Sequence, residues 1–162
     1  MRQSAARHIS SLLAVVPICT MVFAQSVQVK FDHLTHEQEL SQSTVNAIAQ
    51  DTLGYLWFGT QDGLNRFDGY GISVFKHAMG DTTTLADNSI WCLLSDSHGD
   101  LWIGTMRGGA DRYRPTENRF YHYTHRPEDS TSLSENTVIS LFEDSDRNLW
   151  LGTLNNGLNR FE

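Results

Sequence analysis

A motif that occurs three times constrains this 162-residue chain more than any other feature. Each copy reads Leu-Trp, one apolar residue, then Gly-Thr, and the three tryptophans are 45 and 48 residues apart. Internal repeats of about 40–50 residues are typical of propeller blades and of solenoid units. The three copies of the motif are Leu56–Thr60, Leu101–Thr105 and Leu149–Thr153.

The first repeat unit favours a propeller blade over a solenoid unit. It contains four short runs that are separated by Gly and Asp turns, as in an antiparallel meander. No stretch after residue 24 shows a long helical period. We therefore predict an all-β fold of β-propeller blades, about three four-stranded antiparallel blades in an incomplete propeller. The four predicted strands are Val45–Gln50, Leu56–Thr60, Leu64–Phe67 and Ile72–Phe75.

The repeat borders divide the chain. We expect blade 1 at 44–84, blade 2 at 85–132 and a partial blade 3 at 133–162. Known propellers have about 4–8 blades, so three units do not close a ring and the chain is expected to be an N-terminal fragment. Residues 25–43 are expected to be a lead-in, with Val27–Phe31 as the outer strand that closes the last blade.

Residues 1–24 have the pattern of a signal peptide. Two arginines precede Leu12–Phe23, an apolar run of about 12 residues that is shorter than the roughly 20 needed to span a membrane. Small residues at the -3 and -1 positions predict cleavage between Ala24 and Gln25, and hence a periplasmic location. The alternatives are an uncleaved anchor or a lipoprotein signal at Cys19, where the preceding isoleucine is not small.

The charge of the mature chain excludes one class of partner. Ten basic and 19 acidic residues follow residue 24, so the formal net charge of this part is -9. Binding to a phosphate backbone needs clustered Lys and Arg, and no nucleic acid is expected as a partner. Cys92 is the one cysteine after residue 24, which excludes an intrachain disulfide and favours a small core residue.

The repeated Trp and Gly residues are predicted to pack blades together. A large ring on a middle strand fills the wedge between adjacent sheets, and a Gly two residues later leaves room for the next blade. The alternative is that the tryptophans stack on sugars, but recurrence at one structural position favours packing. These structural repeat residues are Trp57, Gly59, Trp102, Gly104, Trp150 and Gly152.

No catalytic residue, metal site or cofactor is predicted. Asp51, Asp96 and Asp144 recur at one position and are expected to cap turns. The segment that starts at Asp144 resembles the beginning of a calcium loop, but Leu149 stands where Gly is required. The histidine pairs at 33 and 36 and at 122 and 125 are three residues apart, so on a strand they point to opposite faces.

Ligand binding is a better hypothesis than catalysis. In a propeller the loops between second and third strands lie at the same end as the loops between blades, here His77–Ser89 and His125–Thr137. These loops differ between units while the strand residues repeat, which is typical of contacts on a scaffold. The candidate ligand-binding residues are Gln61, Asp62, Arg107, Asn155 and Trp91, of which Trp91 has no match in the other units.

The repeat also resembles a known family. The Leu-Ser start, the Asp-x-x-Gly turn, Leu-Trp-x-Gly-Thr and the closing Gly-Leu-Asn-Arg-Phe, as at Gly63–Phe67, are similar to the two-component regulator propeller repeat. The resemblance covers roughly residues 27–162. Departures such as Ala110-Asp111, where the other units have Leu-Asn, are expected to be turn variation. Members form the periplasmic sensor regions of Bacteroidetes-type hybrid two-component histidine kinases.

This resemblance implies a sensor segment that detects carbohydrate, with an oligosaccharide as ligand. Its implied partners are the remaining blades and a kinase in a full-length, inner-membrane protein, which is expected to be a dimer. The kinase has no counterpart in these residues. A stand-alone interaction scaffold of the cell envelope is the alternative hypothesis, and part of a propeller polysaccharide lyase or hydrolase is a third.

Overall fold

A computed structural model describes residues 29–31, 33 and 40–162 of the chain. The chain divides into two units, residues 1–32 and 33–162. The signal peptide, its cleavage site and most of the lead-in lie outside the described residues. Of the expected closing strand, Val29–Phe31 is described and none of these three residues is assigned to a strand, so the closing strand stays a prediction.

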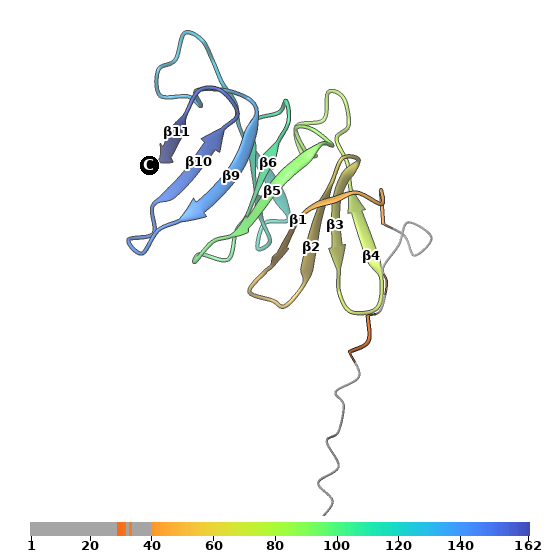
Figure 1. Cartoon of the computed structure of the whole chain (residues 1–162). Helices are drawn as coiled ribbons and strands as arrows, with labels where there is room; N and C mark the ends of the chain where they lie inside the picture. Colours follow the sequence, from red (N-terminus) through yellow and green to blue (C-terminus); the bar gives the residue numbers. More distant parts are fainter. Residues whose placement is uncertain (1–28, 32, 34–39) are drawn as a thin grey trace, which may run out of the picture. The chain divides into compact units, whose positions relative to one another are not determined.

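Three antiparallel sheets follow one another along residues 45–161, which confirms the all-β fold of propeller-type blades (Figure 1). Two sheets have four strands and the third has three, and neighbours in sequence are neighbours in each sheet. The first sheet contains β1 (Val45–Gln50), β2 (Leu56–Thr60), β3 (Gly63–Phe67) and β4 (Ile72–Phe75). The second contains β5 (Ile90–Ser95), β6 (Leu101–Thr105), β7 (Ala110–Arg114) and β8 (Arg119–Tyr123). The third contains β9 (Val138–Glu143), β10 (Leu149–Thr153) and β11 (Leu158–Phe161).

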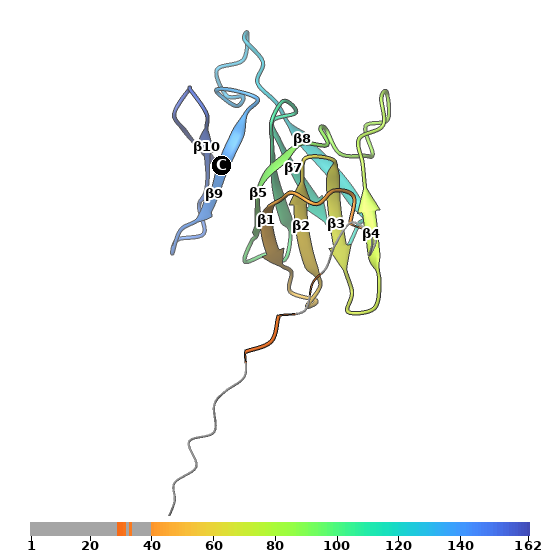
Figure 2. The ribbon, with the colours of Figure 1, turned by 45° about the vertical axis from the view of Figure 1, so that its right-hand side comes forward.

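The first strands of the sheets, β1, β5 and β9, lie side by side and contact one another in that order (Figures 1 and 2). Each of them carries a β-bulge near its start, where one extra residue interrupts the register with the second strand. Bulges redirect a side chain away from the regular alternation of the strand. The extra residues are Asn46, Trp91 and Ile139.

Two apolar clusters join the sheets in pairs. Trp57 from the first sheet is 1% exposed and packs with Leu101 and Ile103 of the second. Trp102 is 2% exposed and packs with Leu149 and Leu151 of the third. Each ring therefore fills the wedge between two successive blades, where burial of a large aromatic group stabilises the pair of sheets.

In each sheet the turn between the first and second strands is hydrogen-bonded to the tryptophan of the repeated motif. The indole Nε1 of Trp57 donates to Asp51 Oδ2 over 2.8 Å, and the same bond joins Trp102 to Asp96 and Trp150 to Asp144. The other oxygen of each aspartate accepts two backbone N–H groups of its own turn. The recurring aspartates thus cap turns and also fix the orientation of the tryptophan rings.

The glycines of the first two motifs lie where the first strand of the next sheet passes. A Cβ on Gly59 would lie 2.5 Å from Ile90 Cγ2 of the second sheet, and one on Gly104 would lie 2.8 Å from the Val138 carbonyl oxygen of the third. Both distances are shorter than van der Waals contact, so a side chain at either position would push successive blades apart. Across the described ranges, no helix is long and apolar enough to cross a membrane.

Candidate functional site

The loops that join blades and the hairpins between second and third strands lie at the same end of the sheets, uppermost in Figures 1 and 2. They are also hydrogen-bonded to each other. Met106 N–H donates to the Ser89 carbonyl oxygen over 2.9 Å, and Leu154 N–H donates to that of Thr137 over 3.0 Å. We call this surface the loop end.

The two long loops are built alike, although their sequences differ. The N–H of His77 donates to Asn88 Oδ1 over 2.7 Å, and the N–H of His125 donates to Asn136 Oδ1 over 2.6 Å. An Asp–Thr turn also recurs, at Asp81 and at Asp129. The two loops differ at other positions, but the residues that form this internal network recur in both.

The hairpin candidates differ in what they contact. Gln61 and Arg107 are exposed, and neither side chain forms a hydrogen bond or ion pair with the described part of the chain. Asp62 forms an ion pair with Lys76 over 2.7 Å. Asn155 donates to Glu135 through its backbone N–H over 2.8 Å, and this bond lowers the pKa of the Glu135 carboxyl. Gln61 and Arg107 thus remain available to a ligand, whereas Asp62 and Asn155 already have partners.

Trp91 occupies the bulge of β5, and its structural equivalents are Asn46 and Ile139. The same position carries a different residue type in each blade, so the tryptophan at this site has no counterpart in the other two blades. Its side chain is 44% exposed and forms no hydrogen bond to any described residue. An exposed indole at a bulge on the innermost strand is a suitable platform for a flat apolar ligand surface.

The loop end carries further exposed apolar side chains on the second and third blades. The backbone of Met106 is hydrogen-bonded to the residues that precede β5 and β9. Its N–H donates to the Ser89 carbonyl oxygen, and its own carbonyl oxygen accepts from Thr137 Oγ1 over 2.8 Å. The equivalent positions on the first blade are the amides Asn46 and Gln61. At these bulge and hairpin positions the loop end is therefore apolar on blades 2 and 3 and polar on blade 1. Its exposed apolar members are Trp91, Met106, Ile139 and Leu154.

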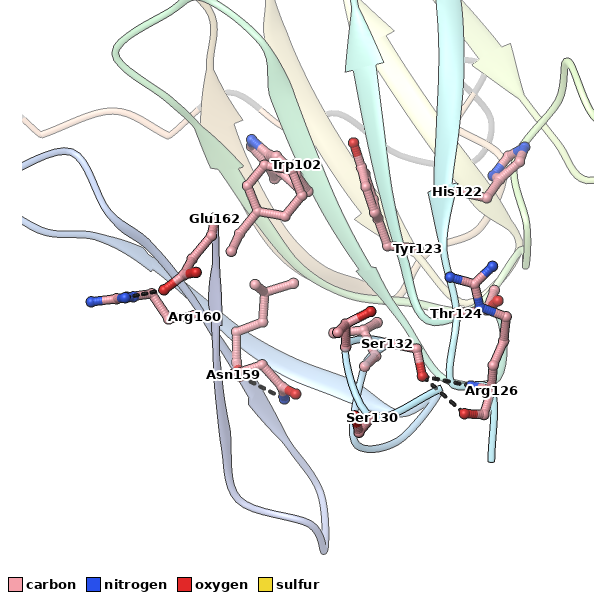
Figure 3. A pocket seen from close by; sticks show the side chains of 14 residues that line it. Trp102, His122, Tyr123, Thr124, Arg126, Ser130, Ser132, Asn159, Arg160 and Glu162 are labelled. Atoms are coloured by element: carbon pink, nitrogen blue, oxygen red, sulfur yellow. Dashed lines mark hydrogen bonds and ion pairs between the residues drawn. The ribbon is translucent and has the colours of Figure 1, made fainter. Parts of the chain in front are cut away.

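A cleft of about 620 Å³ lies between β8 and the third sheet (Figure 3). Its floor is aromatic: Trp102 stacks on Tyr123 with ring centroids 5.3 Å apart, and both rings contact Phe161. Arg160 and Glu162 pair at its rim. This cleft was not predicted from the sequence, although Trp102 and Phe161 lie at positions that are aromatic in all three units.

The packing of the preceding blade pair explains this cleft. Between the first and second sheets, Phe120 of β8 packs against Tyr113 and is 5% exposed. Phe161 occupies the position of Tyr113 on β11, and among the described strands β11 has no fourth strand beside it. The cleft thus corresponds to the space that Phe120 fills one blade earlier, which indicates a blade-packing position rather than a separate site.

The geometry offers little for metal or acid–base chemistry. Within residues 29–31, 33 and 40–162, no group of three or more His, Cys, Asp or Glu is arranged to hold a metal. The ring Nδ1 of His125 binds the Leu133 carbonyl, while that of His122 binds Asp111. Burial raises the pKa of the Cys92 thiol to about 12, so this cysteine is not a reactive thiolate.

Two polar contacts between elements were not predicted from the sequence. Asp111 on β7 is 0% exposed and pairs with His122, so the interpretation of Ala110–Asp111 as turn variation is wrong. Ser97 donates through its N–H and Oγ to Glu143 of the next blade. Comparison of equivalent positions contained a signal for the first contact, since the other two blades have Asn where blade 2 has an acid.

Comparison with known proteins agrees with the repeat. The model of the Two component regulator propeller matches residues 39–62, 84–107 and 132–155. Histidine kinase P4 of Formosa agariphila is 42% identical over 63 residues, which are 39% of this chain and 5% of that protein. The chain thus spans a small part of this relative.

Solved structures give the same result. The extracellular domain of the putative hybrid two component system BT3049 from B. thetaiotaomicron superposes with a TM-score of 0.76 and 30% identity, over 81% of this chain and 18% of that one. The extracellular domain of the putative hybrid two component system BT4673 from B. thetaiotaomicron superposes with a TM-score of 0.63 and 28% identity, over 82% of this chain and 18% of that one. Together with the matched segments, these likenesses identify the three blades as two-component regulator propeller repeats.

Proposed function

We propose that this chain is an exported, ligand-sensing propeller segment of a hybrid two-component sensor histidine kinase, and that its ligand is an oligosaccharide. The likeness to extracellular domains of hybrid two-component systems supports the sensor role. The exposed Trp91 at the loop end carries the ligand assignment, because an indole face stacks on the apolar face of a sugar ring.

Unpartnered polar groups at the loop end support the same ligand class. The side chains of Gln61 and Arg107 offer donors for hydroxyl or carboxylate groups, and neither has to break an existing bond within the described residues. Signalling would require that the sugar bind one arrangement of the blades more tightly than another. The kinase and the remaining blades belong to the full-length protein in this proposal.

A glycan array tests this proposal with the complete exported region of the protein. The Trp91→Ala variant is expected to lose about tenfold in affinity for the oligosaccharide that binds best, which corresponds to roughly 1.4 kcal/mol. Tyr70→Ala is the matched control, since Tyr70 is a 99% exposed aromatic residue on the β3–β4 hairpin at the opposite end. Equal loss in both variants, or no binding to any glycan, would contradict the proposal.

One observation favours a second function. Trp91, Met106, Ile139 and Leu154 form an exposed apolar group of the kind that docks proteins. In a stand-alone envelope scaffold this group would bind a partner protein, and no glycan would compete with it. Pull-down from the envelope with the exported region, with and without the best array glycan, separates the two functions. Chromatography of the glycan after incubation reports any cleavage that an enzyme would cause.

A further inference from the structure

Blade 2 differs from its neighbours at one buried polar position. Asp111 of β7 occupies the site held by Asn65 in β3 and by Asn159 in β11. Asp111 is 0% exposed, as is Asn65. Replacing a neutral amide by a carboxyl group inside a sheet is costly unless its surroundings compensate. The partners of the three residues show how blade 2 compensates for this cost.

In blades 1 and 3 the amide forms a neutral pair with a serine. Asn65 Oδ1 accepts from Ser41 N–H over 2.8 Å, and its Nδ2 donates to Ser41 Oγ over 2.8 Å. Asn159 forms the same two bonds with Ser134, each 3.0 Å long. Each serine lies on the segment that enters the blade, so this pair fastens the incoming chain to the third strand.

In blade 2 both partners have changed. Alanine replaces the serine, and its backbone N–H still donates to Asp111 Oδ2 over 2.8 Å. The second carboxyl oxygen, Oδ1, lies 2.6 Å from Nδ1 of His122 on β8. His122 is directly opposite Asp111 in the strand register, where the first blade has Val74 opposite Asn65. The three residues of blade 2 are Ala86, Asp111 and His122.

The position of His122 fixes where its protons lie. Its Nε2 is 2.9 Å from the Thr82 carbonyl oxygen, which can only accept, so Nε2 carries a hydrogen. The contact between Nδ1 and Asp111 Oδ1 then needs one more proton, on either the ring or the carboxyl group. Loss of that proton would leave one hydrogen for the two ring nitrogens, so a lone pair would face either the Asp111 carboxylate at Nδ1 or the Thr82 carbonyl oxygen at Nε2, and one of the two contacts would become repulsive.

From this geometry we infer that Asp111 and His122 form a proton-sensitive latch that holds the loop between blades 1 and 2. The latch grips the loop at two points, the Thr82 carbonyl and the Ala86 N–H. The same loop contacts both neighbouring hairpins, through Asn88 to Gly63 and through Ser89 to Met106. Release of the latch therefore loosens the loop end beside Trp91.

The electrostatics set the direction of the switch. The hydrogen bond to Asp111 raises the pKa of His122, and burial raises the pKa of Asp111. A raised pKa in the folded state means that the stabilisation is fully present below the unfolded value, about 6.5 for histidine, and is lost as pH rises through the folded value. The latch is thus closed in acid and opens in alkali.

The charged groups around Asp111 and His122 do not reverse the direction of these pKa shifts. Asp87 adds to the raised pKa of Asp111 by repulsion, and one of its oxygens is buried without a partner in the described residues. Asp81 on the same loop is held by Thr83. Arg126, which shares the cleft with His122, pairs with Asp129. On β7, Arg112 pairs with Asp100.

Hydrogen exchange of single backbone amides tests the latch in the complete exported region, from pH 5.5 to 9. The amide of Ala86 is compared with that of Ser134, its equivalent in blade 3, which is held by a residue that does not titrate. After correction for intrinsic exchange, protection of Ala86 relative to Ser134 is expected to fall about tenfold for each pKa unit by which folding raises the pair's value.

A triple variant supplies the matched control. Ala86→Ser, Asp111→Asn and His122→Val together rebuild in blade 2 the arrangement of blade 1, so this variant is expected to fold. In the variant, the backbone amide at position 86 should keep constant protection relative to that of Ser134 over the whole range. A flat profile in the unmodified protein, or an unchanged slope in the triple variant, would overturn the latch. The latch is independent of the proposed ligand, and failure of glycan binding leaves this test unaffected.

Discussion

At the scale of single residues, the recurring aspartates do more than cap turns. Asp96 is 8% exposed, and its carboxylate accepts two backbone N–H groups and the indole of Trp102. Hydrogen bonds to a buried charged group are stronger than those between neutral groups. The turn, the carboxylate and the wedge ring therefore stabilise one another within each blade.

Replacement of Asp96 by Asn tests this coupling. The variant places an NH₂ group among three donors, so the free energy of unfolding is expected to fall by about 1–3 kcal/mol. Denaturant titration measures the change. Asp146→Asn is the control, because the Asp146 side chain is exposed and accepts no hydrogen bond from the described residues. Equal stability of both variants would show that the aspartate is a turn residue only.

The third aspartate gives a prediction about pH. The hydrogen bond from the indole N–H of Trp150 lowers the pKa of Asp144 most, and the hydrogen bond from Asn148 is the next largest cause. Together they bring this pKa to about 2. A lowered pKa in the folded state gives a stabilisation that is present above the unfolded value, 3.8, and is lost as pH falls toward 2. Carbon NMR of the Asp144 carboxyl should show a midpoint near 2. A midpoint close to 3.8 would mean that the bond to Trp150 is not formed.

At the scale of elements, regular patterns were predicted from the sequence and tertiary pairs were not. The strands of the first blade were predicted to within one residue, because turns and apolar runs are local signals. The cleft of Figure 3 and the contact of Asp111 with His122 depend on residues from different strands. The cleft has no local signature in the sequence, because it forms only where two sheets pack together. The only signal for the contact of Asp111 with His122 was the acid at a position where the other two blades have Asn.

The close approach of blades at the motif glycines gives a prediction at this scale. Gly104→Ala is expected to destabilise the protein by about 1–3 kcal/mol, because the new methyl group would meet the backbone at Val138, which cannot rotate away. Gly71→Ala is the matched control, since a Cβ there meets nothing within 4 Å. Thermal unfolding of both variants measures the difference. A stable Gly104→Ala protein would show that the blades are more loosely packed.

At the scale of the whole molecule, each blade presents two apolar faces to its neighbours. Positions buried between blades are exposed on the outer sheets: Leu158 is 64% exposed, whereas the equivalent Leu64 is 0% exposed. Ile48 on the first sheet and Phe142 on the third are 65% and 63% exposed. Exposed apolar faces of this kind promote association. These faces are where we expect the further blades of the full-length protein to pack.

This arrangement predicts that the 162-residue chain associates with itself when it is isolated. Phe142→Ser combined with Leu158→Ser should shift the chain toward monomer in analytical ultracentrifugation, because both substitutions remove apolar surface from one outer face. Met79→Ser, at a loop residue that is 96% exposed, is the control. Association that persists equally in both variants would argue against packing through the outer sheets.

The most direct test of the sensor account is hydrogen exchange of the complete exported region with and without the oligosaccharide that binds best on the array. The account predicts that the sugar slows exchange at the loop end, in the segments around Trp91 and Met106. Exchange in the turns of the opposite end, such as Asp51–Tyr55, should not change. Protection confined to those turns or to the cleft beside Tyr123 would contradict the account, and the ligand site would then have to be sought there.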